Sequence, residues 1–455
     1  MPTIDLNSGA AAAVIDEVDL VDLPVTGSIP EDLNGVLIRN GPNPLLGRFK
    51  GNDVLDWWPE DAMLHGISLH GGRAASYRNR WARTKRWADV YQPDAVPALV
   101  DTNPNVNVLV HAGEILALAE GGAPLAITAE LETLGAARCH PGLANGMTAH
   151  PKVDLHTGEL MSFRADWKPP FLRYVVTDPK GAPSLDIDVE MSSPSMMHDM
   201  AITATRSIFL DLNVGYDFSM LTRGYRMPLR WRDDHQARLG IVPRHGGELL
   251  WFEIAPCFIQ HVVNAYDADA ATVVLDVVRY PSYFRLAEGS ATFEDAPLGV
   301  PWRYVIDLDR GVVTEEKIAD ICIELSRINE ERTGRPYRFF YAAEQPTNTE
   351  IRGVIRYDFE SGSVQRYEVR DGDQNSEPVF VARPDSSGED DGWLLVCIYR
   401  GATDTTDLVI LDGKNIESPP IATVSLPRRI PAGFHGAWLP EGCGAETPGS
   451  RQGAA

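Results

Sequence analysis

Short apolar runs recur along most of the chain, and turn residues separate one run from the next. Val, Ile, Leu, Phe and Tyr dominate these runs, a composition typical of β-strands. Motifs rich in Gly, Pro, Asp and Asn lie between them and mark turns. The clearest strand-like runs are GVLIRN (35–40), LMSFRA (160–165), LRYVVT (172–177), SIFLDLNV (207–214), ATVVLDVVRY (271–280), VIRYDF (354–359), PVFVAR (378–383), WLLVCIYR (393–400) and LVILD (408–412).

Few segments carry the pattern of an amphipathic helix. KRWADVYQPDAV (85–96) and LSRINEER (325–332) are the two short pieces for which we expect helix. No Gly/Ser-rich or Pro-rich linker divides the chain, and no crisp repeat of the WD or kelch kind is visible. Many short strands without a linker predict an all-β fold, a propeller or a barrel, formed as a single domain over 1–455. We expect its ends, at about 1–12 and 443–455, to fray.

The charge and cysteine content indicate which binding partners and which cellular compartment to expect. The 455 residues carry a formal net charge of −23, which argues against a nucleic-acid partner and against a basic membrane-binding patch. The five cysteines are scattered and form no C-x-x-C pair, as in proteins of a reducing compartment. The N-terminus lacks the basic and apolar regions of a signal peptide, and no apolar run is long enough to span a bilayer. We therefore expect a cytoplasmic protein.

The histidines fall into contrasting sequence contexts. Four lie beside turn residues and are expected at the surface: His70, His156, His235 and His245. Four others lie inside apolar or aromatic strand-like runs: His150, His198, His261 and His435. A buried imidazole needs a partner, since an unpaired buried polar group costs about 1–3 kcal/mol.

These four embedded histidines are 48, 63 and 174 residues apart, too far for a local zinc loop. They can converge only where distant elements meet, as on the central axis of a propeller. The spacing alone leaves a metal site open but favours four separately bonded core histidines.

The motifs around these histidines resemble those of the carotenoid cleavage oxygenase family, which includes apocarotenoid oxygenases and lignostilbene dioxygenases. The resemblance runs almost end to end, and each histidine lies in its own matching motif, in order. It is carried by IPEDLNGVLIRNGPNP (29–44), MLHGISL (63–69), YRNRWART (77–84), LALAEGG (116–122), AHPKVDLHTGEL (149–160), the His198 and His261 segments, SEPVFVARPD (376–385) and GFHGAWL (433–439).

The resemblance implies a seven-bladed β-propeller with a small helical cap over the active-site end. It also implies an Fe(II) ion held by the four histidines already named. Three glutamates are expected behind them, each accepting the second ring N–H of a ligand: Glu120, Glu324 and Glu377. By analogy with the family we expect Glu324 on His198, Glu377 on His261 and Glu120 on His435, with His150 unpaired.

The activity implied is that of a non-haem Fe(II)-dependent dioxygenase. Such an enzyme cleaves a C=C bond of a carotenoid or apocarotenoid with O2 and gives two carbonyl products, without flavin or nicotinamide. The apolar, conjugated substrate is expected to reach the iron through a tunnel under the cap. A weak peripheral contact of an apolar cap surface with a membrane is compatible with the acidic charge. Candidate tunnel residues, none separable from ordinary core, are Trp81, Phe258, Phe340 and Trp438.

Three positions depart from the family pattern. WWPEDAM (57–63) replaces W-F-x-G-D-G-M, so the local turn must differ. Val106 stands where some relatives carry a threonine near the open iron position. Ala119 replaces the lysine with which lignostilbene cleavers bind a phenolic oxygen, which favours a carotenoid-type substrate. Cleavage of a stilbene or phenylpropene olefin, a non-oxygenating retinoid isomerase and a non-catalytic ligand-binding propeller remain as alternatives.

Overall fold

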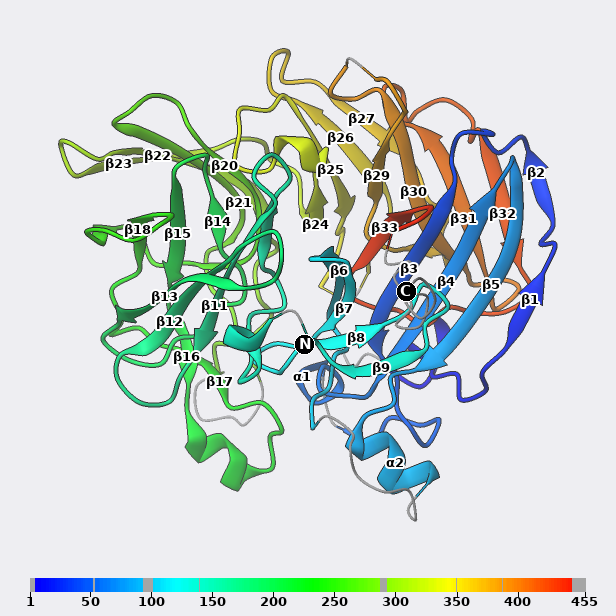
Figure 1. The fold of residues 1–455 in the computed structure, drawn as a ribbon, viewed down its shortest axis with the longest axis horizontal. Helices are drawn as coiled ribbons and strands as arrows, with labels where there is room; N and C mark the ends of the chain where they lie inside the picture. Colours follow the sequence, from blue (N-terminus) through cyan, green and yellow to red (C-terminus); the bar gives the residue numbers. More distant parts are fainter. Residues whose placement is uncertain are drawn as a thin grey trace, which may run out of the picture.

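The strands form seven radial sheets around a central axis, as Figure 1 shows. This computed structural model describes residues 5–51, 54–92, 101–138, 140–286, 293–348, 350–386 and 388–443. Neighbouring strands within a sheet are antiparallel, as expected for blades built from consecutive hairpins. The expected seven-bladed β-propeller is therefore confirmed.

In each blade one strand lies innermost, next to the axis. The first blade, from its outer edge inward, is β1 (Asp19–Val21), β5 (Arg73–Trp81), β4 (Ala62–His70), β3 (Gly35–Pro42) and β33 (Gly436–Pro440). The second to fourth blades, from the axis outward, are β6 (Asn107–His111), β7 (Glu114–Leu118), β8 (Leu125–Ile127) and β9 (Thr133–Ala136); β10 (Lys152–Asp154), β11 (Glu159–Ala165), β12 (Phe171–Thr177) and β13 (Pro183–Glu190); and β14 (Ala201–Ile202), β15 (Arg206–Asp211), β18 (Arg238–Pro243) and β19 (Leu250–Glu253).

The remaining blades follow in chain order. The fifth and sixth are β20 (Phe258–Asp267), β21 (Thr272–Tyr280), β22 (Val300–Asp307) and β23 (Val312–Lys317); and β24 (Ile323–Arg327), β25 (Phe339–Glu344), β26 (Val354–Asp358) and β27 (Val364–Tyr367). The seventh contains β28 (Gln374–Asn375), β29 (Val379–Ala382), β30 (Gly392–Arg400), β31 (Thr405–Asp412), β32 (Ala422–Leu426) and β2 (Val25–Gly27).

Both ends of the chain close the ring. The C-terminal strand β33 pairs with β3, and β2 joins the outer edge of the seventh blade by pairing with β32. Residues that are far apart in sequence are thereby fixed in one ladder. Close approach at the first blade requires glycine, because a Cβ on Gly41 would lie 2.4 Å from the Cα of Gly433. This contact holds the segment that leads into His435 against β3.

Apolar side chains between neighbouring blades form the core. One cluster joins the third, fourth and fifth blades through Phe163, Tyr174, Phe209 and Leu275, each fully buried. Burial of side chains of this size contributes roughly 1.5–3 kcal/mol each to stability. Inner strands such as β4 and β30 are buried at nearly every position, because both faces of a blade pack against its neighbours. This burial accounts for the continuous apolar runs in the sequence.

Short helices and one hairpin lie outside the blades. They are η1 (Gly9–Ala11), α1 (Val54–Trp57), α2 (Lys85–Tyr91), η2 (Pro141–Leu143), η3 (Phe218–Arg223), η4 (Glu330–Arg332) and the hairpin β16 (Val214–Tyr216)–β17 (Leu229–Trp231). The hairpin, α1 and α2 lie in the lower half of Figure 1, α2 nearest its lower edge, and form the small cap. Arg226 joins two parts of this cap, since its backbone N–H donates to Asp56 Oδ1 at 3.1 Å.

Several sequence-based expectations need correction here. Residues 325–332 are not a helix, because Leu325 to Arg327 continue β24 and only Glu330–Arg332 form a 3₁₀ turn. Helix α2 confirms the other expected helix over 85–91, and residues 93–96 lie outside the described residues. Within the expected N-terminal frayed end, Leu6 and Ala10 are buried. The single-domain extent and the frayed ends remain predictions.

Among the described residues, no helix has the length and apolar character needed to traverse a membrane.

Candidate metal centre

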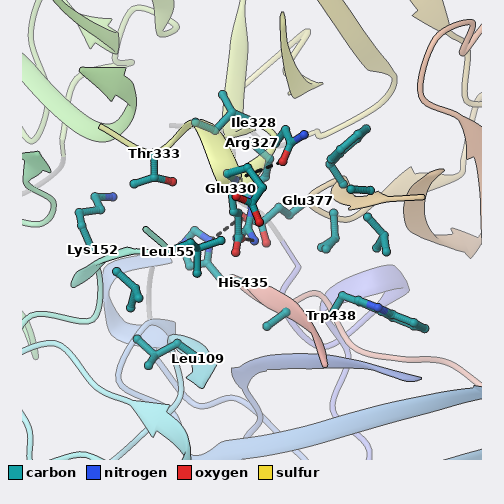
Figure 2. Close-up of a pocket in the computed structure, with 18 of the residues that line it drawn as sticks. Leu109, Lys152, Leu155, Arg327, Ile328, Glu330, Thr333, Glu377, His435 and Trp438 are labelled. Atoms are coloured by element: carbon teal, nitrogen blue, oxygen red, sulfur yellow. Dashed lines mark hydrogen bonds and ion pairs between the residues drawn. The ribbon is translucent and has the colours of Figure 1, made fainter. Parts of the chain in front are cut away.

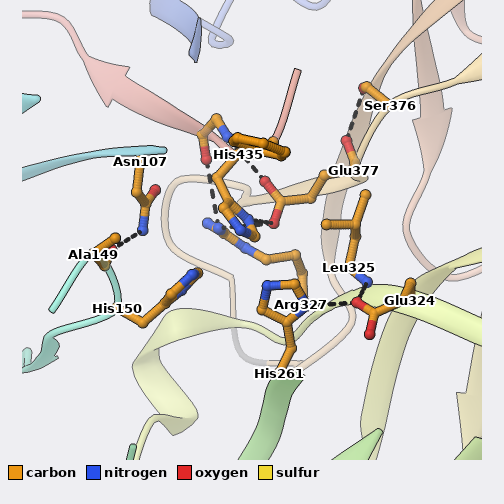
Figure 3. Close-up of polar contacts among 12 residues, drawn as sticks. Asn107, Ala149, His150, His261, Glu324, Leu325, Arg327, Ser376, Glu377 and His435 are labelled. Carbon is orange, nitrogen blue, oxygen red and sulfur yellow. Dashed lines mark hydrogen bonds and ion pairs between the residues drawn. The ribbon is translucent and has the colours of Figure 1, made fainter. Parts of the chain in front are cut away.

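Four histidines from four different blades meet at the propeller axis. His150, His198 and His435 each lie one to three residues before the innermost strand of their blade, and His261 lies inside β20. One nitrogen from each of the four lies within 4.8 Å of those of the others. His150 Nε2 and His198 Nε2 are 3.0 Å apart. Figure 3 shows His150, His261 and His435 converging from separate elements.

The other three blades each contribute a glutamate to the same region. Glu324 lies on β24, Glu377 lies just before β29, and Glu120 follows β7. Every blade therefore supplies one histidine or one glutamate to the axis.

The observed pairs differ from the expected ones. His261 Nδ1 donates to Glu324 Oε2 at 2.5 Å, and His435 Nδ1 donates to Glu377 Oε1 at 2.8 Å. Glu120 Oε2 lies 3.0 Å from His198 Nδ1. The expected pairing was therefore wrong for all three glutamates, although the set of seven residues lies together.

The order of the blades accounts for two of the three corrected pairs. Glu324 on the sixth blade is adjacent to His261 on the fifth, and Glu377 on the seventh is adjacent to His435 on the first. A glutamate side chain reaches a neighbouring blade more readily than one further round the ring. The third pair does not follow this rule, since Glu120 on the second blade contacts His198 on the fourth and not His150 on the adjacent third blade. Among the described residues, His150 makes no carboxylate contact, as expected.

These contacts leave the Nε2 atoms free to face one another. An imidazole that donates through Nδ1 keeps its lone pair on Nε2. The carboxylate that accepts from Nδ1 therefore fixes both the tautomer and the orientation of the ring. His261 Nε2 is buried and has no hydrogen-bond partner among the described residues. A buried nitrogen lone pair aimed at three others is the arrangement expected of a metal site.

Burial and neighbouring charges set the protonation of the cluster. Burial, together with the other three imidazoles, holds the pKa of His150 well below its usual value. Burial also lowers the pKa of His435 to about 4, although Glu377 acts against it. At His261 burial lowers the pKa, but the carboxylate of Glu324 outweighs it and the net shift is upward. His150 and His435 are therefore neutral near pH 7, the form that binds metal ions.

The three carboxylates have different surroundings. Burial raises the pKa of Glu120 despite its contact with His198. For Glu377, burial is outweighed by the positive charge of Arg327 and by the contact with His435, so the pKa falls to about 2. Arg39 Nη1 lies 3.7 Å from Glu377 on a second side. Glu377 is thus held as a carboxylate by two buried or half-buried arginines.

Glu324 has two further donors besides His261. The Tyr280 hydroxyl donates to Glu324 Oε1 at 2.7 Å, and Leu325 N donates to Oε2 at 2.8 Å. Leu325 has a φ of 54°, a left-handed conformation that a leucine seldom adopts. It lies where the β24–β25 ladder shifts register, so a bulge directs Glu324 toward the axis.

A cavity of about 690 Å³ reaches the histidines from one side. It is lined by residues of the innermost strand of each blade and touches His150, His261 and His435. Figure 2 shows its walls, which include Leu109, Lys152, Leu155, Arg327, Thr333 and Trp438.

An aromatic cluster contains residues that closely precede two of the histidines in the sequence. Phe434, directly before His435, has its ring 6.4 Å from that of Trp58 in the cap, and Trp58 lies 5.7 Å from Phe284. Phe258, three residues before His261, stacks on Tyr283 at 5.4 Å. Trp58, Tyr283 and Phe434 are only half-buried. None of these rings is among the residues that line the cavity.

The remaining candidates from the sequence have mixed placements. Phe258 belongs to the aromatic cluster and Trp438 lines the cavity, whereas Trp81 and Phe340 are buried in the core. Val106 accepts from His435 N through its carbonyl at 3.2 Å, while its side chain packs in the core of the second blade.

The surface histidines were predicted with one error. His70, His156 and His245 are exposed, but His235 is only 10% exposed and contacts the buried Asp211 at 2.9 Å. Among residues that sequence reasoning passed over, His65, His111 and His140 are also buried. Asp199, next to His198 in the sequence, is another buried polar residue that the pattern did not single out.

Comparison with known proteins identifies the family. A family model described as "Retinal pigment epithelial membrane protein" matches residues 11–440. A protein of Mycobacterium tuberculosis named "Carotenoid cleavage oxygenase" is 34% identical, over 95% of this chain and 97% of its own length. The chain belongs to the carotenoid cleavage oxygenase family. Its relatives establish it as an oxidoreductase of the dioxygenase class.

Other carotenoid cleavage oxygenases agree in sequence and structure. "Apocarotenoid-15,15'-oxygenase" of Synechocystis is 30% identical over 91% of this chain and 92% of its own. The crystal structure of cobalt-substituted Synechocystis apocarotenoid oxygenase matches with a TM-score of 0.85 and 28% identity, over 96% of this chain and 98% of that one. The lignostilbene dioxygenase of Pseudomonas brassicacearum matches with a TM-score of 0.86 and 25% identity, covering 96% and 99%.

Proposed function

We propose that this protein is a cytoplasmic, non-haem Fe(II)-dependent dioxygenase that cleaves a C=C bond of a carotenoid or apocarotenoid. The observation that carries the proposal is the quartet of imidazoles whose ligand atoms lie within 4.8 Å of one another. In this proposal the metal ligands are His150, His198, His261 and His435, and the residues that orient them are Glu120, Glu324 and Glu377.

The donor set fits ferrous iron. Imidazole nitrogen suits iron among the first-row metals, and four neutral ligands leave the ion its full charge. The carboxylates behind the imidazoles raise the basicity of the ligands without occupying positions on the metal. An ion that accepts six ligands would keep positions for dioxygen and for the substrate.

The overall reaction balances without an external reductant. One C=C bond and one O=O bond break, two C=O bonds form, and both oxygen atoms of O2 end in the two carbonyl products. Bound iron would supply the activation of dioxygen. The chain's own residues fix the imidazole orientation through Glu324 and Glu377 and surround the reacting carbons with apolar side chains that exclude water.

The aromatic cluster favours a long apolar substrate. Trp58, Tyr283 and Phe434 present half-buried rings beside the histidines, which suits a conjugated chain better than a polar molecule. Ala119, next to Glu120, is buried and offers no charged hydrogen-bond donor to a phenol. A stilbene or phenylpropene olefin is the second candidate, supported by the structural likeness to lignostilbene dioxygenase.

Product analysis with labelled dioxygen tests the proposal. Protein loaded with Fe(II) is incubated under ¹⁸O2 with β-carotene, apocarotenals, resveratrol and isoeugenol, and the products are analysed by mass spectrometry. We expect carotenoid or apocarotenoid cleavage with label in both carbonyl products. Cleavage of the phenolic olefins alone would replace the first candidate by the second. Isomerised substrate without label, or intact substrate throughout, would overturn both.

A further inference from the structure

Asp199 is a buried carboxylate that follows His198 directly, accepts two backbone hydrogen bonds and forms one ion pair. It is 1% exposed. Its Oδ1 accepts from Met200 N at 2.7 Å and lies 2.7 Å from Lys152 Nζ, and its Oδ2 accepts from Val262 N at 2.8 Å. A buried carboxylate without partners would be strongly destabilising. Here both oxygens are satisfied, so the group is built into the site.

The partners of Asp199 belong to segments that carry other histidines. Lys152 is two residues after His150, and Val262 is directly after His261. Asp199 therefore joins the innermost elements of the third, fourth and fifth blades, which belong to separate sheets and share no strand ladder. One side chain thus ties together three of the four histidine-bearing segments.

The bond to Val262 lies at an irregular part of β20. The register with β21 shifts on both sides of Val262. Such bulges redirect side chains and leave backbone groups without a ladder partner. Asp199 supplies the acceptor for this N–H, and so stabilises the bulge that places His261 on the axis.

Thr148 is a second link between two of these segments. Its hydroxyl donates to the carbonyl of His198 at 3.0 Å and accepts from His150 N at 3.1 Å. The His150 and His198 segments are thus joined twice, through Thr148 and through the Lys152–Asp199 ion pair. Asp199 extends the network to His261.

We propose that Asp199 is a positioning residue of the metal centre, which sets the spacing of His150, His198 and His261 before the metal binds. The inference rests on the proposed metal-binding function of the quartet. Because the three imidazoles are already placed, metal binding does not have to order three independent segments. Lys152 balances the buried charge and contributes the link to His150.

The test is to measure metal affinity and coordination in Asp199→Asn. An asparagine has a similar shape but only one acceptor oxygen, so it cannot accept from both Val262 N and the Met200 side. The matched control is Asp276→Asn. Asp276, in β21, is also fully buried, but it accepts hydrogen bonds from Arg303 and Tyr337. For each full-length protein we would measure the Co²⁺ dissociation constant by chelator competition, the visible absorption spectrum of bound Co²⁺ and the unfolding temperature without metal.

We expect Asp199→Asn to weaken Co²⁺ binding by about 10- to 100-fold and to alter the Co²⁺ spectrum. Asp276→Asn is expected to lower the unfolding temperature while leaving the affinity and the spectrum unchanged. Lys152→Met, which keeps both backbone bonds of Asp199, should weaken Co²⁺ binding by a smaller factor. It is the deciding variant if Asp199→Asn does not fold. Wild-type affinity and spectrum in Asp199→Asn would overturn the proposal. If Asp199→Asn does not fold, the same result in Lys152→Met would overturn it. Failure of wild-type metal binding would instead contradict the proposed function.

Discussion

His435 donates through Nδ1 to one oxygen of Glu377 at 2.8 Å, and the next backbone amide, Gly436 N, donates to the other oxygen at 2.9 Å. The carboxylate therefore fixes both the imidazole and the start of β33. Arg39 and Arg327 lie at 3.7 and 3.5 Å from the same group, which keeps it ionised. The first and seventh blades are thus joined at the candidate metal site by one side chain.

Glu377→Gln should weaken both metal binding and folding. An amide cannot accept hydrogen bonds on both sides, and Arg39 would be left buried without its counter-charge. We expect the metal affinity to fall about 10- to 100-fold and the free energy of unfolding to fall by about 3 kcal/mol. Chelator competition and urea denaturation measure the two effects. Glu441→Gln, at an exposed glutamate, is the control that should change neither, and an unaltered affinity in Glu377→Gln would remove this residue from the site.

His261→Ala should abolish both metal binding and olefin cleavage. The ring of this histidine lies 4.9–5.2 Å from the rings of the other three, and its Nε2 is buried without a hydrogen-bond partner among the described residues. Metal content after purification and reloading, together with product formation, tests this. His65→Ala is the matched control, because His65 is equally buried but is bonded to Tyr77 in the first blade. Retention of iron and activity by His261→Ala would exclude His261 from the ligand set.

Ala119→Lys should move the substrate preference toward phenolic olefins. A lysine here would give a phenolic oxygen a charged hydrogen-bond donor, worth about tenfold in relative kcat/KM. The measurement is the ratio of kcat/KM for resveratrol to that for an apocarotenal. Ala119→Met adds similar length without charge, so it should leave the ratio unchanged. Equal ratios in the two variants would show that charge at position 119 does not determine the preference.

Asp61→Asn should stabilise the protein at neutral pH. Burial, assisted by the neighbouring Glu60 charge, raises the pKa of Asp61 to about 6 in the folded state, against 3.8 as its ordinary value. The folded state therefore holds this proton more tightly than the unfolded state. The stability that the protonated group supplies is present at low pH and is lost as the pH rises through about 6.

The stability gain of Asp61→Asn over wild type should consequently grow by about 1.4 kcal/mol between pH 5 and pH 7.5. Urea denaturation at both pH values measures it. The position lies in WWPEDAM (57–63), and Asp61 lies 3.1 Å from Arg86. A stability difference that is the same at both pH values would contradict a raised pKa at this position.

The sequence predicted the fold and the composition of the site better than the contacts within it. Four histidines in matching motifs were enough to name the quartet, and the apolar runs located most blades. The glutamate pairs could not be derived, because they depend on how the blades are placed around the ring and on how far each side chain reaches across the axis. Glu377 illustrates this, since its partner His435 is 58 residues away in sequence but lies on the adjacent blade.

Local patterns failed where tertiary contacts determined the structure. Residues 325–332 have helical composition, but pairing with β25 and the bulge at Leu325 keep the first part in a strand. His235 lies beside charged and turn residues in the sequence, yet its contact with the buried Asp211 keeps its side chain largely buried. Asp199 gave no separate signal, because its role depends on Lys152 and Val262 from two other blades.

The most direct test of the central claim is a crystal structure of the Fe(II)-loaded protein, grown without oxygen, with anomalous diffraction recorded at the iron edge. We predict a single iron peak on the propeller axis within bonding distance of His150, His198, His261 and His435. An absent peak, or an iron bound elsewhere with these imidazoles turned apart, would contradict the account.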